Sequence, residues 1–262
     1  LSPDNGLPGW DRISGYYYPD STIAGFSHTH LSGTGAGDLY DISFMPVRLP
    51  AIKAPSPLGI HSKFRHSTEY SRAGYYKVRL DDYDIDVELT ASPRVGLQRY
   101  TMPGGDVAVI LNLSKSMNWD ATTAAGIEIV DSVTLTGYRF SDGWARDQKV
   151  WFATRFSRPF DSVEILDSVI AGGKTAGVSV QDAIFYFATS PGEQITVATA
   201  LSATSEANAL ANLGAEVADV DFDKVSSETR KAWNSELGRV RISTPDTTLR
   251  RIFYTALYHS ML

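Results

Sequence analysis

A long series of short apolar segments in the middle of the chain constrains the fold more than any other feature. Some segments alternate apolar and polar side chains, which is typical of strands with one buried face, and others are almost continuously apolar. Turn residues separate them at short spacing, which predicts a mainly β fold, a large antiparallel sandwich of two sheets. The expected strands are Tyr75–Leu80, Ile85–Ala91, Val95–Met102, Val107–Leu113, Ile127–Val130, Val133–Phe140, Val150–Phe156, Val163–Ile170, Val178–Val180, Ala183–Ala188 and Ile195–Leu201.

The residues before this series are less regular. Leu39–Val47 is the first good strand candidate, ended by its proline. Residues 48–74 contain prolines and little periodicity, which predicts a long irregular connection in which His61 and His66 are solvated. The acidic run Asp81–Asp84 predicts a hairpin turn, because it lacks the spaced acids and terminal Glu of an EF-hand.

Helical patterns occur only near the C-terminal end. Ser205 is the expected N-cap of a helix that ends at Leu213, before Gly214. An apolar stripe predicts a second helix over Phe222–Leu237, and Arg239–Ser243 is expected to form a short strand.

A third helix is expected after Thr244-Pro245-Asp246, with the threonine as N-cap and the proline as first helical residue. A strongly amphipathic helix normally packs on something, and no partner for this one is evident before Leu262. We therefore expect a β-sandwich domain at 1–220, a helical linker at 221–243 and the start of another domain at 244–262. The apolar stripe of the third helix comprises Leu249, Ile252, Phe253, Ala256, Leu257 and Met261.

Charge and composition exclude several classes of function. The net charge of -6 argues against a nucleic-acid partner or an anionic membrane surface. No apolar run approaches eighteen residues, so no membrane span is expected. The chain contains no cysteine, which excludes disulfides, zinc–thiolate sites and cysteine nucleophiles.

The stretch from Gly25 to Asp38 is the main candidate for a functional loop. It combines His28 and His30 with hydroxyl residues and four glycines, and it holds too few apolar side chains to be core. Aromatic residues near Trp10 and Tyr17 lie upstream, and rings beside polar groups suit a sugar, whose apolar face stacks while its hydroxyls bond. A plain glycine-rich loop remains open, whereas a metal site lacks a third ligand.

A second candidate loop lies between two expected strands, at Ser141–Gln148. Trp144, Arg146 and Gln148 could contact a sugar there. The favoured interpretation is a turn whose tryptophan caps the end of the sandwich, because one exposed tryptophan does not make a site.

Several sequence blocks resemble glycoside hydrolase family 92. The most specific is Asp20–Gly35, which reads DSTIAGFSHTHLSGTG and is similar to the signature near the start of this family. Members are calcium-dependent, inverting, exo-acting α-mannosidases. The other matching blocks follow in order as Leu1–Asp4, Gly15–Tyr18, Gly74–Tyr76, Glu88–Ala91, Arg94–Tyr100 and Phe253–His259.

The resemblance implies a supersandwich-like β domain followed by an (α/α)₆ barrel, of which residues 244–262 are the first helix. It places the acid, the base and the calcium ligands beyond Leu262, so no catalytic or metal-binding residue is assigned within the chain. A glycosidase needs two carboxyl groups, and the aspartates here form no convincing pair; Asp20 and Asp41 are interpreted as turn or cap residues. The substrate-binding residues expected from the motif and its neighbours are Ser27, His28, Thr29, His30, Trp10, Asp11 and Asp38.

The expected function is the N-terminal portion of an exo-α-mannosidase that releases terminal mannose from glycans, with α-1,2 linkages as the expected target. Its partners are then a mannose-containing glycan and the C-terminal catalytic domain of the same protein, and its location is secreted, periplasmic or on the bacterial cell surface. The alternative is a non-catalytic carbohydrate-binding or structural β-sandwich module. Such a module folds alone and binds sugar without turnover.

Overall fold

The fold consists of two antiparallel sheets and three helices, in a computed structural model that describes residues 1–5, 10–12, 14–31, 38–50, 59–114, 120–171 and 175–262. One sheet runs in the spatial order β1 (Ser2–Asp4), β3 (Gly25–Ser27), β4 (Ser43–Arg48), β10 (Gly105–Asn112), β15 (Ser179–Thr189) and β14 (Ser162–Val169). The other runs β11 (Ala121–Ile129), β12 (Thr134–Asp142), β13 (Gln148–Phe156), β16 (Gln194–Ser202), β9 (Val95–Thr101), β8 (Ile85–Ala91), β7 (Tyr75–Leu80) and β6 (Tyr70–Arg72). The minor elements are the pair β2 (Thr22–Ile23) with β5 (Ser62–Lys63) and the 3₁₀ turns Trp10–Arg12 and His66–Thr68.

The main core lies between the two sheets, as the sandwich prediction requires. Tyr100 and Phe152 of the eight-stranded sheet are fully buried there with Val109 of the six-stranded sheet. Phe156 and Phe185 bring their ring centroids to 4.9 Å across the interface. Burying one such phenylalanine contributes roughly 1.5–3 kcal/mol, so these rings are a large part of what joins the layers.

The eight-stranded sheet is also covered on its outer face. Helices α1 (Glu206–Glu216) and α2 (Phe222–Leu237) pack there in a second apolar cluster. Along β16, Val197 belongs to the inner core and Ala198 to this outer cluster, as the two-residue period of a strand requires. Leu213 of α1 and Phe222 of α2 are buried against it.

The helices α1 and α2 largely confirm the sequence analysis. Ser205 accepts a hydrogen bond from the Asn208 amide at 3.1 Å, so it is the N-cap of α1. This helix runs past Gly214 to Glu216, because Glu216 is anchored by Ser92 and Arg94 of the turn between β8 and β9.

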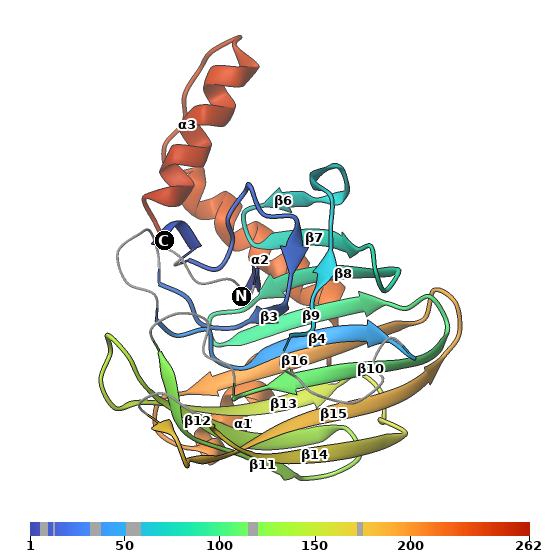
Figure 1. The fold of residues 1–262 in the computed structure, drawn as a ribbon. Helices are drawn as coiled ribbons and strands as arrows, with labels where there is room; N and C mark the ends of the chain where they lie inside the picture. Colours follow the sequence, from blue (N-terminus) through green and yellow to red (C-terminus); the bar gives the residue numbers. More distant parts are fainter. Residues whose placement is uncertain (6–9, 13, 32–37, 51–58, 115–119, 172–174) are drawn as a thin grey trace.

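The segment after α2 differs from prediction. Arg239–Ser243 forms no strand, because no neighbouring strand offers it a ladder partner. Helix α3 (Thr247–His259) begins later than predicted, with Asp246 instead of Thr244 as its N-cap. It extends away from both sheets (Figure 1). None of the three helices is long and apolar enough to cross a membrane.

Strand β4 starts later than the predicted Leu39–Val47 and continues through its proline to Arg48. Pro46 is tolerated because β3 pairs with β4 only at Phe44, so the side of Pro46 away from β10 has no ladder partner to lose. The preceding residues Leu39, Tyr40 and Ile42 have positive φ angles instead of strand geometry.

Candidate functional site

The candidate loop consists of two facing stretches, residues 27–31 and 38–42; residues 32–37 between them lie outside the described residues. The amide of His28 donates to the carbonyl of Asp41 at 3.0 Å, and that of Tyr40 to the carbonyl of Thr29 at 2.9 Å. The backbone angles φ of 77°, 67° and 55° at Leu39, Tyr40 and Ile42 are left-handed. Such angles cost roughly 1–3 kcal/mol each in non-glycine residues and persist only where surrounding contacts hold them.

His30 and Ser27 are held by a buried carboxylate of β1. The hydroxyl of Ser27 donates to Asp4 Oδ1 at 3.0 Å, and His30 Nε2 lies 2.8 Å from Ser27 Oγ and 3.0 Å from Asp4 Oδ1. Because a carboxylate only accepts, the ring proton belongs on Nε2. Gly15, with φ of 92°, leaves the room for this ring, since a Cβ there would lie 3.0 Å from it.

His28 occupies different surroundings. Its Nδ1 donates to the carbonyl of Ile42 at 2.7 Å, and its ring edge fits against Gly96, where a Cβ would lie 2.6 Å away. Nε2 is buried and has no hydrogen-bond partner among the described residues. Burial lowers the pKa of His28 to about 3, so the ring is neutral near pH 7.

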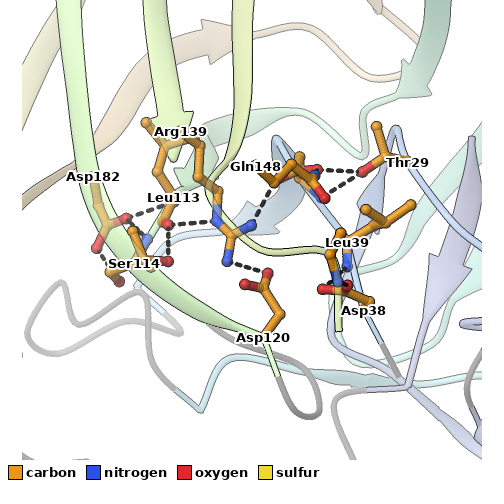
Figure 2. Close-up of polar contacts among 12 residues, drawn as sticks. Thr29, Asp38, Leu39, Leu113, Ser114, Asp120, Arg139, Gln148 and Asp182 are labelled. Atoms are coloured by element: carbon orange, nitrogen blue, oxygen red, sulfur yellow. Dashed lines mark hydrogen bonds and ion pairs between the residues drawn. The ribbon is translucent and has the colours of Figure 1, made fainter. Parts of the chain in front are cut away.

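Behind the loop lies a buried ion cluster centred on Arg139 of β12 (Figure 2). This side chain is only 1% exposed. Its Nη1 donates to Asp41, its Nη2 lies 2.7 Å from Asp120 Oδ2, and its Nε donates to the carbonyl of Leu113 at 3.0 Å. Burial raises the pKa of Asp120 against the opposing effect of Arg139, and the two carboxylates together raise the pKa of Arg139 although burial acts to lower it.

Asp41 transmits this anchoring to the loop and to a neighbouring turn. Its Oδ2 accepts from Thr29 Oγ1 at 2.7 Å and from Gln148 Nε2 at 2.8 Å. Its amide donates to Thr29 Oγ1 at 2.8 Å. Asp41 is thus a central tether of the loop, more than a turn or cap residue.

Asp38 is fully buried and joins the loop to the turn between β12 and β13. Its carboxylate accepts from the amides of Leu39 and Ala145. Gly143 permits the close approach, since a Cβ there would lie 2.4 Å from Asp38 Oδ1. The two loops singled out in the sequence therefore form one connected unit.

Trp10 and Asp11 lie on the exposed 3₁₀ turn Trp10–Arg12, beside this unit. The carbonyl of Arg12 accepts from the Tyr40 hydroxyl at 2.7 Å. The guanidinium of Arg12 pairs with Asp20 at 2.7 Å, so Asp20 is an ion-pair partner instead of a simple cap.

A small pocket opens between β1, β2 and the aromatic segment that follows the 3₁₀ turn. Its empty space of about 180 Å³ includes open solvent, so the pocket is a shallow hollow and not an enclosed cavity. Asp4 Oδ2 is buried and without a hydrogen-bond partner in the described part of the chain. The lining residues are Pro3, Asp4, Asn5, Gly15, Tyr16, Tyr17, Asp20, Thr22, Ile23 and Phe64.

The charged groups of the unit do not form a metal or glycosidase centre. Among the described residues, no group of three or more His, Asp or Glu side chains could hold a metal ion. Asp41 and Asp120 are both buried and both contact Arg139, so a sugar cannot reach them. Whether Ser27, His28, Thr29 and His30 touch a sugar stays a prediction; what the geometry shows is that their side chains hold the loop.

Sequence reasoning missed the partners that anchor this loop. Arg139 follows Leu135 at even spacing in β12, so alternation places it on the buried face. A buried arginine requires carboxylates as partners, so this position in the strand pattern could have indicated a buried ion cluster. Asp4 and Asp120 gave no comparable signal, because their contacts come from distant parts of the chain.

The sequence pattern of the glycosyl hydrolase family 92 N-terminal domain matches residues 1–202, and that of the family 92 catalytic domain matches residues 208–262. A protein from Arthroderma benhamiae described as an uncharacterized secreted glycosidase is 23% identical, over 98% of this chain and 37% of its own length.

Two solved structures from Bacteroides thetaiotaomicron are similar over all of this chain. A family GH92 alpha-mannosidase is 29% identical with a TM-score of 0.88, and the match covers 100% of this chain and 37% of that protein. A family GH92 inverting mannosidase is 26% identical with a TM-score of 0.78, over 100% of this chain and 35% of that protein. The chain thus spans a little over a third of the length of these relatives.

Proposed function

Because the chain belongs to glycosyl hydrolase family 92, we propose that its full-length gene product is an exo-α-mannosidase that releases terminal mannose from glycans. The proposed reaction proceeds with inversion, requires calcium and favours α-1,2 linkages. The observation that carries the proposal is the match of the whole chain to an alpha-mannosidase at a TM-score of 0.88. That protein is also known in complex with mannoimidazole, a fact that favours mannose as the sugar recognised here.

In this proposal, residues 1–262 supply one wall of the sugar pocket. The loop unit of residues 27–31 and 38–42 is rigidly anchored and lies beside the exposed Trp10 and Asp11. A stacking ring next to fixed polar groups is what recognition of a single sugar needs, because orientation has to be set before the bond is broken.

An inverting glycosidase needs an acid and a base about 6.5–9.5 Å apart, with room for a water between base and sugar. The buried aspartates Asp41 and Asp120 are paired with Arg139 and cannot take these roles. As the resemblance to family 92 implies, we assign the acid, the base and the calcium ligands to residues outside those described. Export from the cell is also proposed, in line with the relative described as secreted.

The test is hydrolysis of α-1,2-mannobiose by the full-length gene product, with calcium and with chelator, followed by proton NMR of the first-released mannose. The expected result is release of β-mannose that the chelator abolishes and calcium restores. Release of α-mannose would contradict inversion, and turnover in chelator would contradict the calcium requirement. No release from any α-mannoside would contradict the proposed function.

The binding-module alternative makes a different prediction for the chain of residues 1–262. It requires the chain to bind mannosides without turnover and the full-length product to be inactive as well. The small pocket beside Asp4 gives it no support, because its empty space of about 180 Å³ includes open solvent. Calorimetry of the chain with α-1,2-mannobiose checks this, and tight binding by the chain alone would favour the module.

A further inference from the structure

Trp144 is the most exposed of the large apolar side chains that the structure describes. It is 72% exposed, on the turn that joins β12 and β13. The sequence favoured a tryptophan that caps the sandwich end, and the structure shows instead a ring directed into solvent. The predicted turn is confirmed, but a ring so exposed covers little of the sandwich end, so capping does not account for this side chain.

The turn that carries Trp144 is held from three sides. The amide of Gly143 donates to the carbonyl of Ala145 at 3.1 Å, and the amide of Ala145 donates to the buried Asp38. Gln148, at the end of the turn, donates to Asp41 at 2.8 Å. The ring is therefore presented by an ordered backbone, which lowers the entropic cost of binding a ligand against it.

The same contacts fix how far Trp144 lies from the candidate sugar loop. Trp144 is covalently next to Ala145, which bonds to Asp38, and Leu39 then pairs with His30. Consecutive Cα atoms are ~3.8 Å apart and paired antiparallel residues ~5 Å, so the Cα atoms of Trp144 and His30 lie within ~20 Å. This is an upper limit on their separation, so the ring lies near enough to the loop for sugar units linked to a terminal mannose to reach it.

The surroundings of the ring also suit a sugar. Arg146 and Asp147 are exposed on the same turn, and Arg146 makes no ion pair within the part of the chain that is described. The guanidinium of Arg146 can donate hydrogen bonds to sugar hydroxyls, whereas the carboxylate of Asp147 pairs with Lys149 at 3.1 Å. Indole supplies a large rigid apolar surface at low conformational cost.

We propose that Trp144 is the stacking platform of an outer subsite, which binds the part of an oligomannoside beyond its terminal mannose. This inference rests on the proposed function and adds a preference for longer glycans over short mannosides. The tethers to Asp38 and Asp41 make the outer subsite and the terminal-sugar loop one rigid unit.

The experiment compares two substrates of the full-length gene product, an α-1,2-linked mannotetraose and an aryl α-mannoside. The quantity compared is kcat/KM for the tetraose divided by kcat/KM for the aryl mannoside. In Trp144→Ala this ratio is expected to fall about tenfold, because KM for the tetraose rises. Trp144→Phe is expected to restore most of the ratio, because it keeps an aromatic face. The matched control is Tyr70→Ala, which removes a ring that is 58% exposed on β6, at the other end of the eight-stranded sheet.

Three results would overturn the inference. They are an unchanged ratio in Trp144→Ala, an equal loss on both substrates, and the same fall in the Tyr70→Ala control. If the wild type hydrolyses neither substrate, the proposed function fails. The subsite is then decided by affinity electrophoresis in gels containing yeast mannan: retardation that Trp144→Ala loses supports it, and equal retardation of both proteins overturns it.

Discussion

Single buried polar residues determine the shape of the candidate loop. Its left-handed residues at Leu39, Tyr40 and Ile42 cost roughly 1–3 kcal/mol each. Hydrogen bonds to charged groups contribute about 1.5–3 kcal/mol each, and Asp41 alone accepts such bonds from Thr29 and Gln148. Buried ionic contacts thus offset a strained backbone that no apolar packing would select.

His28 should make the stability of the protein depend on pH. Burial lowers its pKa from 6.5 to about 3, so between these values the unfolded chain holds a proton that the folded chain lacks. The free energy of unfolding attributable to His28 therefore falls as pH decreases from about 6.5 towards 3, by at most ~1.4 kcal/mol per pH unit.

The variant His28→Asn tests this dependence, because asparagine keeps an N–H donor for the Ile42 carbonyl but does not titrate. Urea unfolding at several pH values between 4 and 7 measures how the free energy of unfolding depends on pH. This dependence should be less steep in the variant, by the equivalent of close to one proton taken up on unfolding. Parallel pH profiles for the two proteins would show that His28 does not titrate in this way.

Arg139 should be the costliest ion-pair residue to replace. Arg139→Met leaves Asp41 and Asp120 buried without their cation, and breaking such a buried pair costs about 3–5 kcal/mol. The control is Arg65→Met, whose pair with Asp81 is exposed and should cost less than about 1 kcal/mol. Urea unfolding measures both, and similar losses in the two variants would rule out a special role for the buried cluster.

At the scale of elements, the sequence predicted what local periodicity determines. Alternation located most strands, and the bounds of α2 were predicted at Phe222–Leu237 as observed. Prediction from the alternating pattern failed where contacts with distant parts of the chain determine the structure. Arg239–Ser243 has a strand-like pattern but pairs with no strand among the described residues. Leu39, Tyr40 and Ile42 adopt positive φ angles instead of strand geometry.

The same distinction explains the candidate site. A functional loop near His28 was predictable from composition, since glycines and hydroxyl residues do not build a core. Its anchors were not, because Arg139 lies 98 positions from Asp41 and only the folded sandwich brings them together. The alternating pattern could have placed Arg139 on the buried face, but it could not have identified Asp41 as the partner of its guanidinium.

The turn between β6 and β7 is predicted to control the docking of α2. Gly74 has φ of 74°, and a Cβ there would lie 2.3 Å from Thr229 of α2. Gly192 has φ of 80° with open space around it, so Gly192→Ala costs only the backbone strain, roughly 1–2 kcal/mol. Gly74→Ala should cost more because it adds the clash. Thermal unfolding of both variants checks this. Equal decreases in the thermal midpoint would mean that α2 moves aside at no cost in stability.

At the scale of the whole molecule, stability is unevenly distributed. The eight-stranded sheet has apolar clusters on both faces, whereas α3 has no buried residue. Only a few contacts hold α3 to the rest, including the Trp233 and Tyr258 rings, whose centroids are 4.7 Å apart, and a bond from the Tyr254 hydroxyl to the Val240 carbonyl. Segments with so few buried contacts open at low free-energy cost.

Limited trypsin digestion of the chain of residues 1–262 should therefore begin next to α3. Arg239 and Arg241 are exposed in the irregular segment between α2 and α3, and a protease needs such a segment to open locally. We expect an early fragment that ends at one of them and keeps the β-rich circular dichroism and the thermal midpoint of the intact chain. First cleavage inside the sandwich, or loss of its thermal transition once α3 is removed, would show that α3 contributes to the stability of both sheets.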